Sequence, residues 1–360
     1  MKRTALSLAT LAFVAIACSS PDTRPDGKPR VDRGPYIQNT TRHETTVCWR
    51  TTAPAPSLVH VTDQSDVTST TALETEHFVT LANLKEGSSY TYKVDGEDAE
   101  HTFKTAPGPD GEFRALVIGD SGEDTKGQMD VAKLMEKESY DLFLHTGDIV
   151  YPHGEDENYD SKFFKQYNSM LGSHNFWAAV GNHDRHKPSN GEPYKRLFRQ
   201  EANNPAKDKY YYSFTWGNAK FVSIESYAMF KKSGPHMAWL EQELASNDRK
   251  WLVLMMHVPI YSTGNHGDSA ELVTQLVPLI QKYKVALVLQ GHDHLYERGE
   301  KDGTRYIVTG GGGAGLYPVK QRHPWTAYTE SSFHYVSLEF GKQAITGKMV
   351  RSNGSVGDTF

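Results

Sequence analysis

The sequence predicts an α/β protein in two parts: a small all-β sandwich, then a larger unit of two packed sheets covered by helices, an αββα arrangement. In the first part, residues 33–107, short runs of alternating apolar and polar residues are separated by turn residues, as in antiparallel strands. In the second part, residues 112–350, apolar runs of strand length alternate with amphipathic runs of helix length, and strands alone follow. Residues 107–111 (PGPDG) read as the linker.

Within the second part, the buried strands are predicted in the runs FRALVIGD, DLFLHTGD, FWAAVGNHD, KFVSIES, KWLVLMMHVP and VALVLQGHDH. Helices are predicted over residues 126–138, 163–171, 236–246 and 270–283. The later runs RYIVTGG, FHYVSLEF and QAITGKMV are expected to form an antiparallel second sheet.

The N-terminal residues 1–18 are expected to be an export signal, because two basic residues precede an apolar run too short to span a bilayer. The run ends in a sequence that resembles a bacterial lipoprotein cleavage box with Cys18 as the lipidated residue. Ordinary cleavage after a small residue is the alternative. Residues 19–32, rich in Pro and charge, are predicted to be a flexible tether. We therefore expect an exported protein, lipid-anchored in the bacterial cell envelope (periplasm or cell surface) through Cys18, or otherwise secreted.

Composition excludes some classes of protein. The chain of 360 residues is 38% hydrophobic and 23% charged, as in soluble proteins with a sizeable core. Its formal net charge of -5 argues against a surface that coats nucleic acid. Cys48 alternates with apolar residues and is expected to be a buried thiol. With Cys18 as its only possible partner, the fold cannot depend on a disulfide framework.

Five of the predicted strands end in potential metal ligands. Because the carboxyl ends of parallel strands meet at one edge of a sheet, these residues are expected to line one crevice. Carboxylate, amide and imidazole groups together suit two cations that share a site. Glycine precedes several of them, which lets the backbone approach an ion closely. The candidates are Asp120, Asp148 with Tyr151, Asn182, His257, and His292 with His294.

Each motif alone has an ordinary structural explanation. A Gly-Asp pair after a strand commonly forms a turn, Asn182 or Asp184 could cap a helix, and His257 could be a core histidine. Five such motifs in succession, each at a strand end, are not explained that way. The combination indicates a binuclear metal site.

The blocks GDSG, GDIVY, GNHD, HVP and GHDHLYER resemble those of the calcineurin-like metallophosphoesterase superfamily, and within it the purple acid phosphatases. The stretch RGPYIQNTTRHETTVCWRTT resembles the start of the fibronectin-III-like domain that precedes the catalytic domain in that family. The resemblance covers about residues 33–350. It implies a hydrolase whose substrates are small phosphate monoesters, which it cleaves by attack of a metal-activated hydroxide.

The resemblance also implies roles for the ligands. The first ion would be held by Asp120, Asp148, Tyr151 and His294, and the second by Asp148, Asn182, His257 and His292, so that Asp148 bridges. A free tyrosine ionises at about pH 10, so a phenolate ligand implies a strongly acidic ion such as Fe(III). Its partner would be a divalent Fe, Zn or Mn ion.

Three further residues are expected to contribute to catalysis. His183 matches the histidine of the family that contacts the phosphate or protonates the leaving alkoxide. Asp184 would orient His183 and stabilise its charge. His266 matches the first of two adjacent histidines in a family loop, and Gly267 stands where the second would be.

Other functions remain open at this point. A phosphodiesterase or nucleotidase could use the same metal site. Residues 187–212 are expected to rim the pocket and to determine which of these substrates is accepted. A surface-binding module with an inert second domain would be expected to lack a ligand, and a sensor would lack His183. Neither loss is seen.

Overall fold

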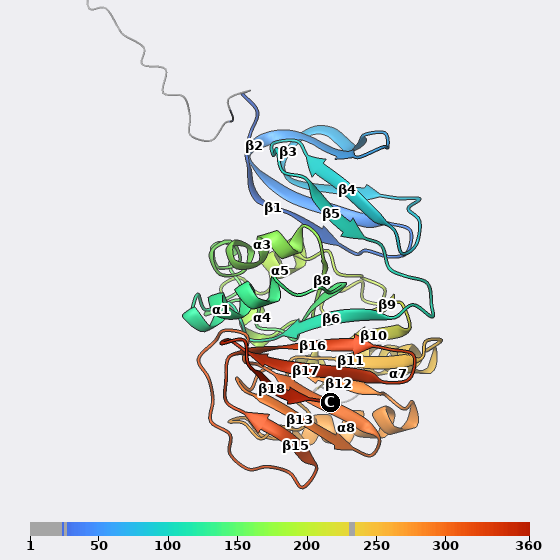
Figure 1. Ribbon diagram of the computed structural model, residues 1–360, viewed down its shortest axis with the longest axis vertical. Coiled ribbons are helices and arrows are strands. Elements are labelled where there is room, and N and C mark those ends of the chain that lie inside the picture. Colours follow the sequence, from blue (N-terminus) through green and yellow to red (C-terminus); the bar gives the residue numbers. More distant parts are fainter. Residues whose placement is uncertain (1–23, 25–26, 230–234) are drawn as a thin grey trace, which may run out of the picture.

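The computed structural model describes residues 24, 27–229 and 235–360, which form two parts stacked along the long axis of the molecule (Figure 1). The predicted export signal and Cys18 lie outside the described residues. Among the described residues, no helix has both the length and the apolar character needed to cross a membrane.

The first part contains five strands and no helix between residues 31 and 104. Its long second strand pairs with the first strand over its first half, with the third strand along most of its length and with the fourth at its end. Apolar side chains such as Trp49, Val59 and Tyr92 pack into one core. The likeness of this part to a fibronectin-III domain stays a prediction. The strands are β1 (Val31–Gln38), β2 (Thr45–Val61), β3 (Val67–Leu81), β4 (Ser89–Val94) and β5 (His101–Lys104).

The predicted tether, residues 19–32, is too long at its C-terminal end. Arg30 exchanges hydrogen bonds with Thr52, and β1 already begins at Val31, where its N–H donates to the carbonyl of Gly96 (3.2 Å). The first strand therefore starts two residues before the predicted boundary at residue 33.

The second part consists of two mixed sheets packed face to face. One sheet has six strands in the order β18-β17-β16-β6-β7-β8, and the other has seven in the order β15-β13-β14-β12-β11-β10-β9. Their strands are β6 (Phe113–Ile118), β7 (Leu142–His145), β8 (Asn175–Ala178), β9 (Tyr212–Trp216), β10 (Ala219–Ser223), β11 (Trp251–Met255), β12 (Leu287–Gln290), β13 (Tyr296–Lys301), β14 (Thr304–Thr309), β15 (Thr326–Glu330), β16 (His334–Phe340), β17 (Ile345–Arg351) and β18 (Val356–Thr359).

Helices cover the outer face of each sheet, which gives the predicted αββα layering. Apolar residues of both sheets, among them Val117, Leu144 and Val253, form the central core. A second core lies under α1 and α3, and a third under α7 and α8. The helices are α1 (Lys126–Met135), α2 (Asp156–Tyr159), the π-helical turn η1 (Asp160–Phe164), α3 (Lys165–Leu171), α4 (Asn182–Arg185), α5 (Glu192–Leu197), α6 (Ser226–Met229), α7 (Pro235–Ala245) and α8 (Ala270–Lys282).

The sequence pattern suggested that the last strands form an antiparallel sheet of their own. This prediction is wrong. Strand β14 lies parallel to β12 in the seven-stranded sheet, whereas β16 returns to pair antiparallel with β6. Alternation of apolar residues identifies a strand but does not select its neighbour, because that pairing is non-local. The six-stranded sheet also continues to Thr359 in β18, beyond the predicted limit at residue 350.

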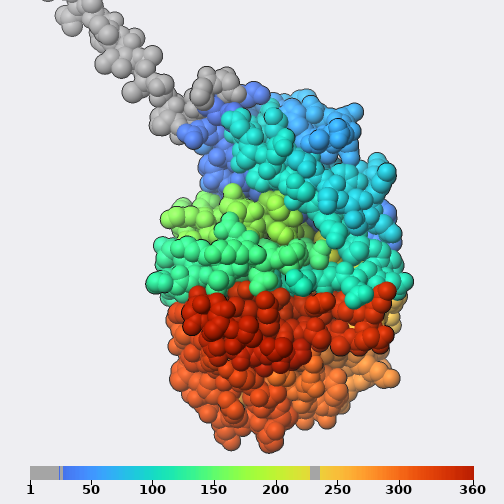
Figure 2. Space-filling model, viewed as in Figure 1, coloured from blue at the N-terminus to red at the C-terminus, as the bar shows by residue number. Residues whose placement is uncertain are grey.

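The two parts share a buried interface. Tyr36 and Cys48 from the first part belong to the apolar cluster under α3, and the Tyr36 hydroxyl donates to the carbonyl of Leu197 (2.9 Å). Cys48 is fully buried, as predicted. Figure 2 shows the N-terminal part seated directly on the layer drawn in green. The first part is therefore held firmly against the helical face of the six-stranded sheet.

Candidate metal centre

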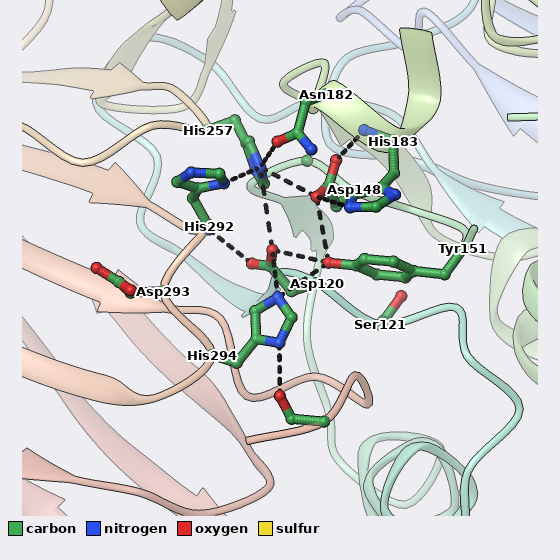
Figure 3. A network of polar contacts seen from close by, with 12 residues as sticks. Asp120, Ser121, Asp148, Tyr151, Asn182, His183, His257, His292, Asp293 and His294 are labelled. Atoms are coloured by element: carbon green, nitrogen blue, oxygen red, sulfur yellow. Dashed lines mark hydrogen bonds and ion pairs between the residues drawn. The ribbon is translucent and has the colours of Figure 1, made fainter. Parts of the chain in front are cut away.

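The predicted ligands come together in one place, where loops leave the carboxyl ends of strands of both sheets (Figure 3). Asp120 follows β6, Asp148 follows β7, and His257 follows β11, each by two or three residues. Asn182 starts α4 after β8, and His292 and His294 follow β12. The site therefore lies at the edge where the two sheets meet, as the strand-end pattern predicted.

The backbone at this edge is strained in three places. Asp120, Asp148 and His292 have φ values of 54°, 52° and 68°, in the left-handed region that residues with a side chain seldom adopt. Such strain persists where the surrounding structure fixes it, and here it turns each side chain toward the centre. A Cβ at Gly181 would lie 2.1 Å from Asp148 Oδ1, and one at Gly291 would lie 2.7 Å from Asp120 Oδ2. Both positions therefore require glycine.

One half of the centre surrounds the hydroxyl of Tyr151. This oxygen lies 3.1 Å from Asp120 Oδ1, 3.2 Å from Asp148 Oδ2 and 3.1 Å from His294 Nε2. His294 Nδ1 donates to the carbonyl of Gly315 (2.7 Å), which leaves Nε2 with its lone pair directed at the cluster. Two carboxylates, a phenol and an imidazole thus converge on one small volume.

The other half surrounds Nε2 of His257. This nitrogen lies 3.2 Å from Asn182 Oδ1, 3.2 Å from His292 Nδ1 and 3.2 Å from Asp148 Oδ2. His257 Nδ1 donates to the carbonyl of Thr146 (2.9 Å), so its Nε2 also points inward. The potential ligand atoms of Asp148, His257 and His292 all lie within 4.8 Å of one another.

Asp148 Oδ2 belongs to both halves, because it contacts Tyr151 on one side and His257 on the other. This is the position that a bridging carboxylate would occupy. The donor set, which combines carboxylate, phenol and amide oxygens with imidazole nitrogens, fits two cations of borderline character.

The electrostatics of the centre favour added positive charge. Burial opposes the protonation of His257, but Asp148 and Asp120 outweigh it and raise the pKa of that imidazole to about 9. Burial, followed by Asp120 and Asp148, raises the pKa of Tyr151 well above its ordinary value. Burial, together with His257 and His266, lowers the pKa of His292 to about 2, which keeps that ring neutral and able to bind metal. A phenolate at Tyr151 therefore requires a strongly acidic cation.

His183 lies beside this centre in α4. Its backbone N–H donates to Asp148 Oδ1 (2.7 Å), and its ring lies 4.3 Å from the ring of Tyr151. His183 Nδ1 donates to the carbonyl of Pro152 (2.7 Å). Its Nε2 therefore faces the centre, 4.0 Å from Asp148 Oδ2, and the side chain is 29% exposed, so a substrate can reach it.

The prediction that Asp184 orients His183 is wrong. The Asp184 carboxylate is buried and accepts hydrogen bonds from the N–H groups of Gly181 (2.9 Å) and Ile149 (3.1 Å) and from the hydroxyl of Tyr159 (3.0 Å). Because the side chains at the first turn of a helix point back toward its start, Asp184 turns away from His183 and caps α4. It holds the two loops that carry Asp148 and Asn182.

His266 also lies at the centre, although its partner was not predicted. The ring stacks on His292 with centroids 3.9 Å apart, and its Nδ1 lies 3.0 Å from Asp293 Oδ1. Asp293 is buried and also accepts from the N–H of His266 (3.0 Å). The residue between the two ligand histidines therefore positions His266.

Sequence reasoning missed other supporting contacts. The hydroxyl of Tyr227 donates to Asn182 Oδ1 (2.7 Å), and the ring of Tyr317 stacks on His294 at 4.1 Å. The run Gly310–Gly313 packs against the first metal loop, where the N–H of Gly312 donates to the carbonyl of Gly119 (2.9 Å). The four successive glycines were the available signal. Tyr227 lies in the short helix α6 and Tyr317 in a loop, and neither belongs to a local motif.

Residues 187–212, expected to rim the pocket, lie mainly elsewhere. Tyr194 and Leu197 of α5 are buried in the core under the first part. His186, immediately before this region, has its ring 4.8 Å from that of His183.

Comparison with family models gives two matches. Residues 113–296 match the model described as calcineurin-like phosphoesterase, and residues 303–359 match the model described as iron/zinc purple acid phosphatase-like protein C. The first match alone spans half of the chain and contains all seven predicted metal ligands.

Similar curated proteins are plant purple acid phosphatases. Purple acid phosphatase 21 of Arabidopsis thaliana is 29% identical over 73% of this chain and 64% of its own length. Probable inactive purple acid phosphatase 27 of the same plant is 26% identical over 79% of this chain and 57% of its own length. Phosphoenolpyruvate phosphatase of Allium cepa is 27% identical, with 73% and 63% covered. The chain thus spans less than two thirds of each of these relatives.

Solved structures show the same fold. A purple acid phosphatase from seeds of yellow lupin (Lupinus luteus) superposes with a TM-score of 0.78 at 22% identity, covering 92% of this chain and 73% of that one. The structure of PhoD gives a TM-score of 0.65 at 13% identity, with 90% and 88% covered.

Proposed function

Because the chain belongs to the calcineurin-like phosphoesterase family, and its similar relatives are purple acid phosphatases, we propose that it hydrolyses phosphate monoesters with two metal ions. The observation that carries the proposal is the position of Asp148 Oδ2, within 3.2 Å of both Tyr151 and His257. It supports two adjacent ion sites with a shared carboxylate.

The ligand sets support particular ions. Asp120, Asp148, Tyr151 and His294 would hold Fe(III), because only a strongly acidic ion would keep the buried phenol of Tyr151 ionised. Asp148, Asn182, His257 and His292 would hold a divalent Fe, Zn or Mn ion. When bound, the pair would supply a hydroxide nucleophile and positive charge that stabilises the transferring phosphate.

The remaining steps fall to residues of the chain. His183 Nε2, left free by the bond from Nδ1 to Pro152, would bind a phosphate oxygen or protonate the leaving alkoxide. His266, held by Asp293, would contact the substrate from the other side of His292. Asp184 would act only by fixing the loops.

A matched pair of substrates tests the proposal. The metal-loaded enzyme should hydrolyse p-nitrophenyl phosphate at least about a hundredfold faster than bis-p-nitrophenyl phosphate, since a diester adds bulk without a new contact. Mass spectrometry of the same sample should find two metal ions per chain. Faster cleavage of the diester would favour a phosphodiesterase with the same centre, and no cleavage of either compound would reject the function.

The location of the protein is a separate proposal. We infer export, with anchoring through a lipidated Cys18 and residues 33–107 acting as a fibronectin-III-like support for the catalytic part. Cys18→Ala should move the protein from the membrane fraction to the soluble fraction. Retention of the variant on membranes would contradict the anchor.

A further inference from the structure

A cavity of about 550 Å³, lined mostly by polar residues, lies next to the metal centre and has no part in the function proposed above. Two segments form its walls, the loop 262–268 and residues 320–324. Its volume lies within the range of small-molecule sites, about 300–1,000 Å³.

The cavity is joined to the centre by short connections. Asn265 and Gly267 line it, and His266 between them stacks on the metal ligand His292. The opposite wall is also connected to a metal ligand. Tyr317 stacks on His294, and the chain continues from Tyr317 directly to Lys320 in this wall. The N–H of Lys320 donates to the carbonyl of Thr263 (2.8 Å), which fixes one wall to the other.

The charge of the lining is cationic, although the chain as a whole is acidic. Lys320 Nζ donates to the carbonyl of Asn265 (3.3 Å), and Arg322 donates to the carbonyl of Thr329 (3.4 Å). Neither has an acidic partner within ion-pair distance among the residues that the structure describes. The one carboxylate of the lining, on Asp268, is paired with His323 (3.0 Å). The two cationic groups are therefore free to bind an anion.

Gly267 keeps this cavity open. It has φ of 66°, and a Cβ built there would meet no heavy atom within 4 Å. A larger side chain, such as the histidine that the resemblance leads one to expect, would project into this free space. With glycine at this position, the contact that a second histidine would make with the substrate is lost, and the space beside His266 stays open.

We propose that this cavity binds a second phosphate carried by the leaving group of the substrate, while the first phosphate lies at the metal centre. The inference rests on the proposed function and narrows it to phosphomonoesters whose alcohol bears another phosphate. Lys320 and Arg322 are the specificity-determining residues, and they act on binding of the leaving group and not on the chemical step.

Paired substrates test this inference. The probes are short α,ω-alkanediols of increasing length, each prepared as the monophosphate and as the bisphosphate. At one or more lengths the metal-loaded enzyme should show a KM about tenfold lower for the bisphosphate, because one charged contact is worth about that factor. The advantage should shrink as salt is added.

Variants assign the effect to the cavity. Lys320→Gln and Arg322→Gln should each remove most of the KM advantage, with kcat and the KM for the monophosphates unchanged. Gly267→Asn should also reduce it, since Asn tolerates positive φ and adds a side chain to the open space. Lys342→Gln is the matched control, because Lys342 lies at the opposite end of the strands from the metal centre. The residue before it, Gly341, accepts a hydrogen bond from Trp251, the first residue of β11.

The outcomes separate the two proposals. Equal KM values for the mono- and bisphosphates at every length would overturn the second-phosphate site. So would variants that change the KM for the mono- and bisphosphates by the same factor. Neither result would contradict the proposed phosphatase activity. Failure of the metal-loaded enzyme to cleave any of the compounds would contradict the proposed function itself, and this inference with it.

Discussion

Two clusters of acidic side chains in this molecule are neutralised in different ways. At the interface between the two parts, the fully buried guanidinium of Arg33 lies 2.5 Å from Asp160, 3.3 Å from Asp156 and 3.1 Å from Glu76. At the metal centre, the side chains of Asp120 and Asp148 are 0% and 2% exposed, yet no Arg or Lys forms an ion pair with either among the described residues.

The difference shows what each cluster is built for. The interface carboxylates have their countercharge within the chain, so they serve to join the two parts. Among the described residues, the side-chain partners of the carboxylates of the centre are His and Tyr groups, and these carboxylates draw a proton onto His257 against its burial. Buried charge of this kind is tolerated when it is paired or binds metal, and here the ligand geometry selects metal.

The largest effect should come from Asp148→Asn, which removes the shared carboxylate. Residues that only support metal ligands cost about 10–100-fold when changed, so loss of a bridging ligand should lower kcat/KM by more than about a hundredfold. Turnover of p-nitrophenyl phosphate and metal content measure it. Asp160→Asn at the interface is the control and should keep both; near-normal turnover of Asp148→Asn would remove the basis for a bridge.

Tyr151→Phe should change the colour of the metal centre. A phenolate bound to Fe(III) should give the purified enzyme a visible absorption band, and this variant should lose the band entirely. Tyr317→Phe, at a tyrosine whose ring stacks on His294, should retain it. A colourless, fully active wild-type enzyme without iron would reject iron at this site.

A change at the interface should affect stability and spare activity. Arg33→Met leaves three carboxylates without their shared partner and should lower the free energy of unfolding by about 2–3 kcal/mol, less than for fully buried pairs because the carboxylates are partly exposed. Urea unfolding measures it, with activity per folded molecule unchanged. Arg196→Met, at an exposed arginine that binds Glu76 and Asp156, should cost less than about 1 kcal/mol.

The smallest effect is expected for Tyr227→Phe. The variant removes the hydrogen bond to Asn182 Oδ1 and should weaken binding of the second metal by about tenfold. Metal retention during dialysis against a chelator gives the value. Tyr283→Phe, which removes a surface bond to Glu241, should behave as wild type, and equal retention in both variants would show that Asn182 needs no such support.

Much of the centre could be predicted from local pattern. Asp120, Asp148 and His292 each follow an apolar run that is a buried strand, and strand ends meet at one edge whatever the order of the strands. The sequence did not predict the role of Asp184, whose bonds to Gly181 and Ile149 depend on the path of two separate loops. Adjacency to His183 in the sequence was misleading because neighbouring residues of a helix point in different directions.

Residue chemistry and the period of apolar side chains were enough to predict which residues could bind metal and that they would lie at strand ends. The pairing of β14 with β12, the return of β16 to β6 and the packing of Tyr36 against α5 emerge only in the folded chain. So does the opening of a cationic cavity at Gly267. These features depend on contacts between residues far apart in the chain, which no local pattern specifies.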